Sequence, residues 1–534
     1  MRHPQWLVAL AACVFATTSL AADPRIGKFV SYRTGDFKVI TSRSGNQARQ
    51  LIEDLGKYRL TLERVLGRHA TNTAIPTQIV IVSDADWRKY LEPRENVAGW
   101  FQRGNFANYL TMNGDAERWF AIHVVFHEYT HYYLASQFAG EYPPWFNEGL
   151  AEVMGYTMFD NDNRAVVQYP TFLVAEARDG DWIPFERMLK VDHYAPEYQS
   201  HKLTASFYAQ SWLTVHYGLI ENREFGHQMM EYLRQLNTLH PIDEAAKNTF
   251  GDLAAADARL RQYSRNSHMG SGALELGDVP KVTLPAPTPV PETDALEILA
   301  NLMLESRMAP ARVRPLVESL MRREPAAARS HILAARLALA EDDKATFDKE
   351  TTAAESALKP DDWEQRRELA GVLVNGSTGA SALALHASAE EERDLKRAFK
   401  LYAEALAHTN QDIEVLWGFG TAATRLNQHM DLAEQALVAA YQRAPSNGNI
   451  ALSLASLKGS QNDLEGMIRY LKDAERFATN LQMRRWATDT LQQTQEQLAA
   501  RQRADEEERK QREAYEKQLA EYEKKYGKAK KKKS

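Results

Sequence analysis

The sequence predicts an α+β domain followed by an all-α array of helix pairs, and three observations support this fold class. The first half of the 534-residue chain alternates short β-branched runs with segments of helical periodicity. A Gly- and Pro-rich stretch, residues 267–293, separates it from an Ala- and Leu-rich second half. In that second half, similar helical segments recur at intervals of about 34 residues. A chain of this length is also too long for one ordinary domain.

Composition excludes several classes of protein and of metal site. Apolar residues make up 44% of the chain and charged residues 25%, as in a globular protein. The net charge of −6 gives no nucleic-acid-binding signature, so we expect no nucleic-acid partner. Cys13 is the single cysteine, which excludes an intramolecular disulfide and a thiolate metal site in the body of the protein. Any metal must therefore use His, Asp or Glu.

The N-terminus predicts an export signal, residues 1–21. A short n-region with Arg2 is followed by an apolar run and by small residues at the cleavage position. The mature protein is then exported, periplasmic or secreted. An alternative is a bacterial lipobox that ends at Cys13 and makes it a lipid anchor, but the apolar run continues past Cys13 and favours the plain signal peptide. No later segment is apolar for 18 residues, so we expect no transmembrane span after signal removal.

The elements before residue 115 predict the α/β part of the first domain. Residues 37–40 (FKVI) and 77–82 (TQIVIV) are typical of strands. Residues 48–66 carry apolar side chains on one helical face. Residues 99–113 mix aromatic and polar side chains, and we expect an extended segment or a hairpin there. An exposed strand edge at this place can bind an extended peptide by β-augmentation.

The strongest chemical signal is His127-Glu128-Tyr129-Thr130-His131. No Pro or Gly lies between Asp115 and Phe138, so we expect a helix. Residues four apart project from the same helical face, and two imidazoles so placed can hold one Zn²⁺. Glu128 stands beside the first ligand, where its carboxylate can take a proton from a metal-bound water. This arrangement is the H-E-x-x-H metalloprotease motif.

A second stretch, Trp145 to Glu152 (WFNEGLAE), supplies carboxylates for the same site. A catalytic zinc needs three protein ligands and one open position, and we predict Glu148 as the third ligand. Glu152, one turn later, can accept the spare N–H of a ligating histidine and orient its ring. His123, one turn before His127, competes as a ligand. It points about 80° away from His131 around the helix, so we expect it in the core or the cleft wall.

The motifs H-E-Y-T-H and W-F-N-E-G-L-A-E together resemble the gluzincin metallopeptidases, in particular the peptidase-MA-like group and bacterial domains with a W-x-x-E-G-L-A-E signature. The resemblance covers roughly residues 37–236. It implies a zincin-like metallopeptidase domain, which we place at residues 24–266. It also implies zinc ligation by His127, His131 and Glu148, with Glu128 as the general base.

The resemblance extends to Tyr208-Ala209-Gln210-Ser211, because members often carry a similar segment downstream. In the aminopeptidase branch a downstream tyrosine stabilises the oxyanion, so Tyr208 is the candidate for that role, with His201 as a competing electrophile. That branch also has a Gly-x-Met-Glu-Asn motif for the substrate's amino terminus. The motif is missing from this sequence, which favours an endopeptidase.

The remaining chain predicts a linker, a repeat array and a tail. Alternating prolines in residues 267–293 favour an extended linker. Residues 294–491 repeat one spacing of small and apolar residues and resemble the tetratricopeptide repeat, with an inserted loop at Asn375–Ala384. Residues 492–534 predict a charged, solvated helix that ends in a basic tail, Lys530–Lys533. The repeated positions are Val313, Val317, Leu320 and Pro325; Ala398, Tyr402, Ala405 and Asn410; Ala433, Leu437, Ala440 and Pro445; and Met467, Leu471, Ala474 and Thr479.

The sequence thus predicts an exported zinc metallopeptidase that cleaves a peptide or protein substrate and binds a protein partner through its helical repeats. Two alternatives stay open. One is a non-catalytic protein-binding scaffold with a degenerate peptidase domain, against which the intact Glu128 argues, because structural zinc needs no adjacent base. The other is a hydrolase of a cell-wall peptide amide, which the sequence does not distinguish from a protein-cleaving enzyme.

Overall fold

The computed structural model describes residues 23–530 except 35–36, 68–76, 93–97, 104–107, 138–141, 193–194, 200, 239–240, 267, 280–284, 378–388 and 479–480. The predicted export signal with Cys13 and the end of the basic tail lie outside the described residues. Among the helices described, none combines the length and the apolar character that crossing a membrane requires.

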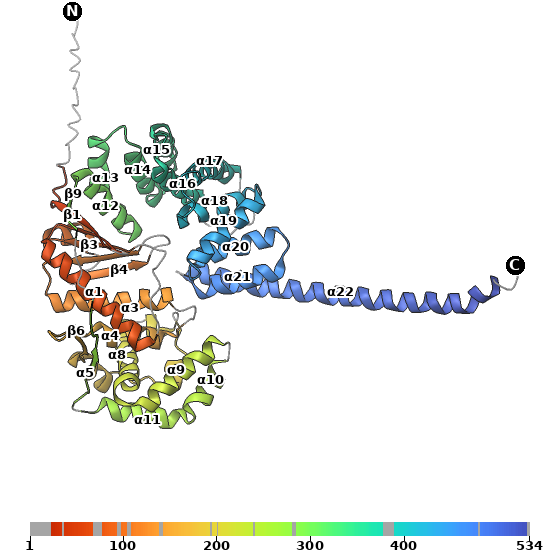
Figure 1. Ribbon diagram of the computed structural model, residues 1–534, viewed down its shortest axis with the longest axis horizontal. Helices are drawn as coiled ribbons and strands as arrows, with labels where there is room; N and C mark the ends of the chain where they lie inside the picture. Colours follow the sequence, from red (N-terminus) through yellow and green to blue (C-terminus); the bar gives the residue numbers. More distant parts are fainter. Residues whose placement is uncertain are drawn as a thin grey trace, which may run out of the picture.

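A six-stranded mixed sheet organises the first half of the chain (Figure 1). Its strand order is β4-β5-β3-β2-β1-β9, and β2 and β5 run parallel to the central β3 while the other neighbours are antiparallel. The predicted strands at 37–40 and 77–82 and the hairpin within 99–113 are confirmed. The strands are β1 (Phe29–Thr34), β2 (Phe37–Thr41), β3 (Thr77–Val82), β4 (Gly99–Arg103), β5 (Asn108–Asn113) and β9 (Thr288–Val290).

Both faces of this sheet are covered, which explains the nearly continuous apolar run of β3. Successive side chains of a strand point to opposite faces. Ile79 and Ile81 belong to the core beneath α1 (Gly45–Leu66) and α3 (Arg118–Gln137). Val80 and Val82 belong to a second core with η1 (Trp87–Leu91), α12 (Glu292–Glu305) and α13 (Pro310–Arg323). A short helix, α2 (Asp84–Asp86), precedes η1.

A helical layer lies on the far side of α3 from the sheet (Figure 1). Its central helix, α4, packs against both α3 and α8. Trp145 at the start of α4 is fully buried in the shared core. The members are α4 (Pro144–Gly155), α5 (Thr171–Asp179), α6 (Phe185–Leu189), α7 (Pro196–Gln199), α8 (His201–His216), η2 (Tyr217–Glu221), α9 (Arg223–Asn237), α10 (Ile242–Phe250) and α11 (Leu253–Ser264), with a small antiparallel sheet of β6 (Thr157–Phe159), β7 (Arg164–Val167) and β8 (Gly272–Glu275).

The structure differs from the predicted linker at residues 267–293. Part of this stretch is β8, which pairs with β7, and another part is β9, which pairs with β1 at the edge of the main sheet. Pro289 lies within β9. An edge strand tolerates proline because one side of it needs no N–H donors. A linker and a proline-bearing edge strand therefore have similar compositions. Residues 280–284 lie outside the described residues.

The second half consists of helix pairs, as predicted. Every apolar or alanine position of the predicted repeat in residues 313–474 is buried, in the second helix of its pair. Phe347, Thr351 and Ala354 of α15 have the same spacing and are also buried, which adds a pair that the sequence analysis missed. The further helices are α14 (Ala328–Ala340), α15 (Lys344–Ala357), α16 (Trp363–Ser377), α17 (Ala389–Leu406), α18 (Ile413–Arg425), α19 (Met430–Arg443), α20 (Gly448–Ser460) and α21 (Leu464–Arg476). The predicted inserted loop begins within the end of α16, and its residues from 378 on lie outside the described residues.

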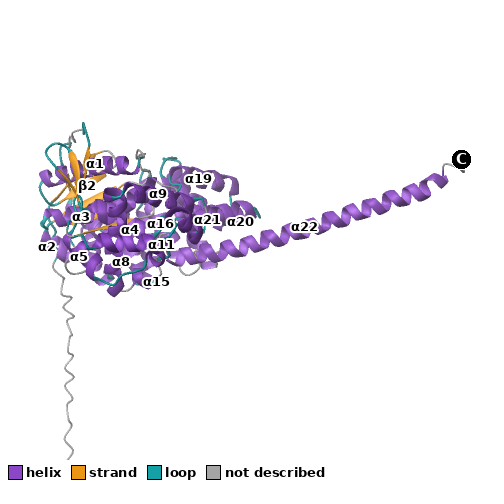
Figure 2. Ribbon diagram, turned by 90° about the horizontal axis from the view of Figure 1, so that it is seen from below, coloured by secondary structure: helices purple, strands orange, loops and turns teal. Residues whose placement is uncertain are grey.

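The chain ends in one long helix, α22 (Leu481–Lys530), of 50 residues. Its first turns close the array: Met483 and Ala487 are buried against α20 and α21. From residue 495 to 524 nearly every side chain is exposed, and Figure 2 shows this part extending away from the body. At 1.5 Å per residue the helix is about 75 Å long. The predicted charged extension is thus a continuation of the helix that caps the repeats.

Tyr58 of α1 packs against α3 and stabilises its position. Its ring stacks on Phe126 at a centroid distance of 4.0 Å, and its hydroxyl lies 2.6 Å from Thr130 Oγ1. Thr130 Oγ1 in turn donates to the carbonyl of Phe126 at 2.9 Å, so the Tyr58 hydroxyl donates to Thr130. The two groups are buried and satisfy each other.

We expect Tyr58→Phe to lower the free energy of unfolding by about 1 kcal/mol, because one buried hydrogen bond is lost while the stacking is kept. Urea unfolding of both proteins measures this difference. Tyr515→Phe is the matched control, since Tyr515 on α22 is 66% exposed, and its unfolding should be unchanged. Equal stability of Tyr58→Phe and the native chain would contradict the support role.

Candidate metal centre

Helix α3 brings two imidazole nitrogens together. His127 and His131 are one turn apart on α3, and their Nε2 atoms are 3.1 Å from each other. Both rings are half-buried in the chain's first core region. The predicted pair of histidines therefore faces a common point.

Helix α4 brings a carboxylate to the same point. It begins at Pro144, where a proline is favourable because the first N–H of a helix has no partner in the helix. Glu148 follows on the second turn and is only 4% exposed. Its Oε2 atom lies 3.5 Å from His127 Nε2 and 3.3 Å from His131 Nε2.

The three ligand atoms fit a tetrahedral zinc site. With bonds of about 2.0–2.1 Å, two ligands of a tetrahedral Zn²⁺ are about 3.3 Å apart. The observed separations of 3.1, 3.3 and 3.5 Å lie around that value. Two imidazoles and one carboxylate are also a donor set used by catalytic zinc, with one position left open. The residues present thus suit the ion that the motif implies.

The electrostatics of the centre favour a positive charge between the three groups. Asn147 Oδ1 lies 3.1 Å from His131 Nδ1, which donates to it, so in the neutral ring His131 Nε2 presents its lone pair to His127. Burial would lower the pKa of His131, but the Glu148 carboxylate raises it to about 9. Burial would raise the pKa of Glu148, but His131 and His127 hold it well below its usual range. A proton or a metal cation therefore belongs at this point.

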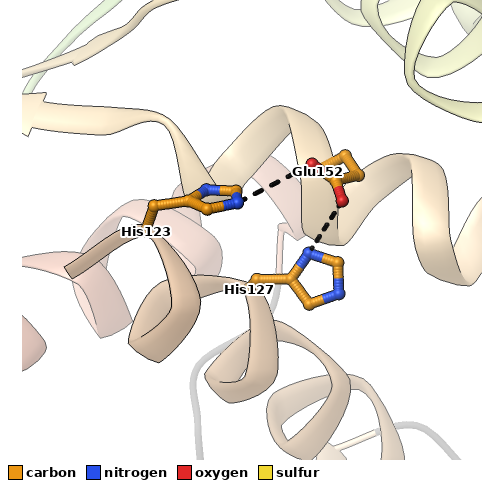
Figure 3. A group of neighbouring side chains, drawn as sticks. All are labelled: His123, His127 and Glu152. Atoms are coloured by element: carbon orange, nitrogen blue, oxygen red, sulfur yellow. Dashed lines mark ion pairs between the residues drawn. The ribbon is translucent and has the colours of Figure 1, made fainter. Parts of the chain in front are cut away.

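Glu152 lies on the other side of His127 (Figure 3). Its Oε1 atom is 3.5 Å from His127 Nδ1, and its Oε2 atom is 3.9 Å from His123 Nε2. Burial raises the pKa of Glu152 and lowers that of His123 to about 4. His127 Nδ1 makes no hydrogen bond within the described part of the chain, so the predicted role of Glu152 as acceptor of its N–H stays a prediction.

His123, His127 and Glu152 could also be considered as a metal site (Figure 3), since their ligand atoms all lie within 4.8 Å of one another. The contacts of 3.5 and 3.9 Å are looser than those around Glu148. The ring of His123 also stacks on that of Tyr156, with their centroids 4.0 Å apart, as expected for a residue in the cleft wall. The tighter triad, His127, His131 and Glu148, therefore fits a metal ion better than this second group.

The other predicted site residues are Glu128, Tyr208 and His201. Glu128 lies on α3 beside His127, is half-buried, and its charge contributes to the raised pKa of His131. Tyr208 on α8 is half-buried and packs against the first core, so its catalytic role stays a prediction. The side chain of His201 lies outside the described residues.

The sequence analysis missed two residues of this centre. Asn147 accepts from His131, and its position next to Glu148 in W-F-N-E was the available signal. Gly149 lets α4 approach α8: a Cβ there would lie 2.4 Å from the carbonyl oxygen of Ser211. A glycine in a predicted helix, directly after a predicted ligand, indicates close packing.

Comparisons with known proteins do not identify a function for this site. No family model and no curated protein matches the chain. Among solved structures, the crystal structure of the yeast Tom70 aligns with 61% of this chain and 70% of its own, at 12% identity and a TM-score of 0.26. A likeness this distant carries no argument about function. The gluzincin resemblance therefore depends on the two motifs, and the repeat array is described from its own packing.

We expect Gly149→Ala to push α4 away from α8 and to lower the free energy of unfolding by about 1–3 kcal/mol, because the added methyl group meets backbone. It should also reduce the zinc bound per chain. Gly56→Ala on α1 is the matched control: a Cβ there meets nothing within 4 Å, and it should stabilise the helix by about 0.5–1 kcal/mol. Urea unfolding and metal analysis of both variants check this. Full zinc content in Gly149→Ala would contradict the requirement for close packing.

Proposed function

We propose that the protein is an exported zinc-dependent metallopeptidase with a zincin-like first domain, and that it acts as an endopeptidase. One observation carries the proposal: two imidazole nitrogens and one buried carboxylate oxygen converge within 3.1–3.5 Å, beside a glutamate of an H-E-x-x-H helix. A structural zinc site would need the ligands but not Glu128. The adjacent carboxylate is what a hydrolase requires.

In the proposed reaction each residue has a separate task. A Zn²⁺ ion at the three ligands would polarise the scissile carbonyl and lower the pKa of a bound water to about 7. Glu128 removes a proton from the attacking water and returns it to the leaving amine. Tyr208 donates to the developing oxyanion, a contact that contributes about 3 kcal/mol in comparable sites. Glu152 and Asn147 hold the rings of His127 and His131 in their ligating orientation.

The edge of the main sheet supports binding of an extended substrate. Strand β4 is the last strand on its side, and among the described residues no strand pairs with its outer edge. It lies along the metal helix, since Phe101 of β4 and Tyr132 of α3 have ring centroids 5.8 Å apart. A peptide added to this edge would pass beside the histidines. A protein chain and a cell-wall peptide meet this requirement equally.

A second candidate function is a protein-binding scaffold in which the first domain does not catalyse. The observation that favours it is the repeat array itself, from α12 to α21, because stacked helix pairs commonly serve as protein-interaction surfaces. The two functions are compatible, since the array can bring a substrate or a partner to the first domain. They differ in whether Glu128 is required for the protein's activity.

We expect Glu128→Gln to keep about one zinc per chain and to lose hydrolysis of a quenched peptide library, because the ligands remain and the base is gone. His131→Ala should lose the metal. Metal analysis and fluorescence release measure both, with and without chelator. Glu117→Gln, an exposed position just before α3, is the control and should match the native chain. Zinc without cleavage in the native chain would favour the scaffold, and absence of zinc would overturn the proposed site.

A further inference from the structure

A large polar chamber lies on the face of the main sheet opposite the metal centre. Its volume is about 680 Å³, within the range of ligand sites. One wall is the sheet, through Lys38, Gln78 and Tyr109 at the beginnings of β2, β3 and β5. The other wall is formed by α12, α14, α16 and α18, the first helices of successive pairs, which arch beside the sheet in Figure 1. The inner side of the array is therefore partly covered by the chain's own sheet.

The chamber carries an excess of negative charge. Six carboxylates and four cationic side chains line it, a formal net charge of −2. The arginines are already paired: Arg329 contacts Asp294 at 2.6 Å and Glu297 at 3.1 Å, Arg336 contacts Glu305, and Arg367 contacts Glu414 at 3.2 Å. Burial raises the pKa of Glu297 and of Glu414 to about 7, so both are partly protonated near neutral pH and the formal charge is an upper bound on the negative excess. The arginine pairs do not fully compensate these two carboxylates, and a further cation would stabilise their ionised form.

Two glutamates of α16 remain available. Glu368 has its nearest cation, Arg367 Nη2, at 3.6 Å, its side chain is 40% exposed, and burial raises its pKa because this cation does not fully compensate the carboxylate. Glu364 makes no ion pair with any residue that the structure describes, and it is exposed. The two carboxylates are one turn apart on one helical face, so a single ligand with spaced positive groups can reach both.

Aromatic side chains lie in the chamber wall and behind it. Tyr402 of α17 is completely buried, and its hydroxyl has no hydrogen-bond partner within the described part of the chain. It lies behind the chamber wall at Gly371, where a Cβ would lie 3.5 Å from the Tyr402 hydroxyl and 3.1 Å from Glu414 Oε1, and Tyr402 itself does not line the chamber. The aromatic rings of Tyr109 and Trp417 also line the chamber. Aromatic faces together with carboxylates are the surroundings that an ammonium or guanidinium group prefers.

We propose that this chamber binds organic cations through their ammonium or guanidinium groups, with Glu364, unpaired among the described residues, and the loosely paired Glu368 as counter-charges and the aromatic rings of Tyr109 and Trp417 as side walls. Because the sheet covers one side, the occupant is slender: a lysine- or arginine-bearing peptide segment or a linear polyamine. A folded partner domain does not fit between the two walls. The site is independent of the metal centre, since the sheet separates the two.

The test is calorimetric titration of the full-length protein with pentalysine, with spermidine and with pentaglutamate, all in the Glu128→Gln background so that no peptide is cleaved. We expect pentalysine to bind, pentaglutamate not to bind, and Glu364→Gln/Glu368→Gln to weaken pentalysine at least tenfold. Glu392→Gln/Glu508→Gln removes the same charge from exposed positions on α17 and α22 and should change the affinity less than twofold. Raising the salt concentration should weaken the remaining attraction.

The two sources are separated by the same titration. Spermidine binding with the same dependence on Glu364 and Glu368 assigns the chamber to polyamines as well, whereas pentalysine binding alone assigns it to peptides. Glu364→Gln alone, at an exposed position, serves if the double variant does not fold, and it should weaken binding about threefold or more. Absence of binding by either cation, or equal weakening in the control variant, would overturn the proposal.

Discussion

The position of α4 between α3 and α8 is the constraint on which the metal centre depends. Two glycines make it possible. At Gly149 the backbone of α4 approaches the Ser211 carbonyl of α8, and at Gly155 it approaches His123 of α3, where a Cβ would lie 2.9 Å from Nδ1. Glu148 directly precedes the first of these close contacts, and Glu152 lies between the two. Because close-packed interiors do not yield easily, the helix spacing determines how far each carboxylate can reach toward the histidines.

The first domain was largely predictable because its signals are local. The strand at 77–82 has the same bounds as β3, and His127 and His131 share one face of α3 as the helical period requires. Glu148 of α4 comes within reach of both, as its motif predicted. Asn147 and the contact between His123 and Glu152 depend on how two helices pack, which no periodicity reveals. Tyr208 illustrates the limit of a motif: the structure places it on α8, but the fold does not test its catalytic role.

The second half shows why composition is a weaker guide than spacing. The repeat spacing found α13, α17, α19 and α21, but it passed over α15 because Thr351 stands where the other repeats have an apolar residue or tyrosine. Prolines at residues 285–291 suggested an extended linker, whereas in the structure they lie in and around the edge strand β9. In both cases the residue type was ambiguous, and the pairing of the segment with a distant one decided its structure.

The edge strand β9 joins the two halves of the chain into one packed structure. It adds to the sheet of the first half and leads directly into α12, whose Leu296 and Leu299 share a core with Ile40 and Val80 of the sheet. Arg312 of α13 also donates to the carbonyl oxygens of Glu92 and Lys89, at 3.1 and 3.3 Å. A continuous core of this kind opposes hinge motion between the halves, since domains move freely where their interface is small and polar. The first helix pair is thus both the start of the array and a cover for the sheet, so the array holds a defined orientation to the metal centre on the opposite face.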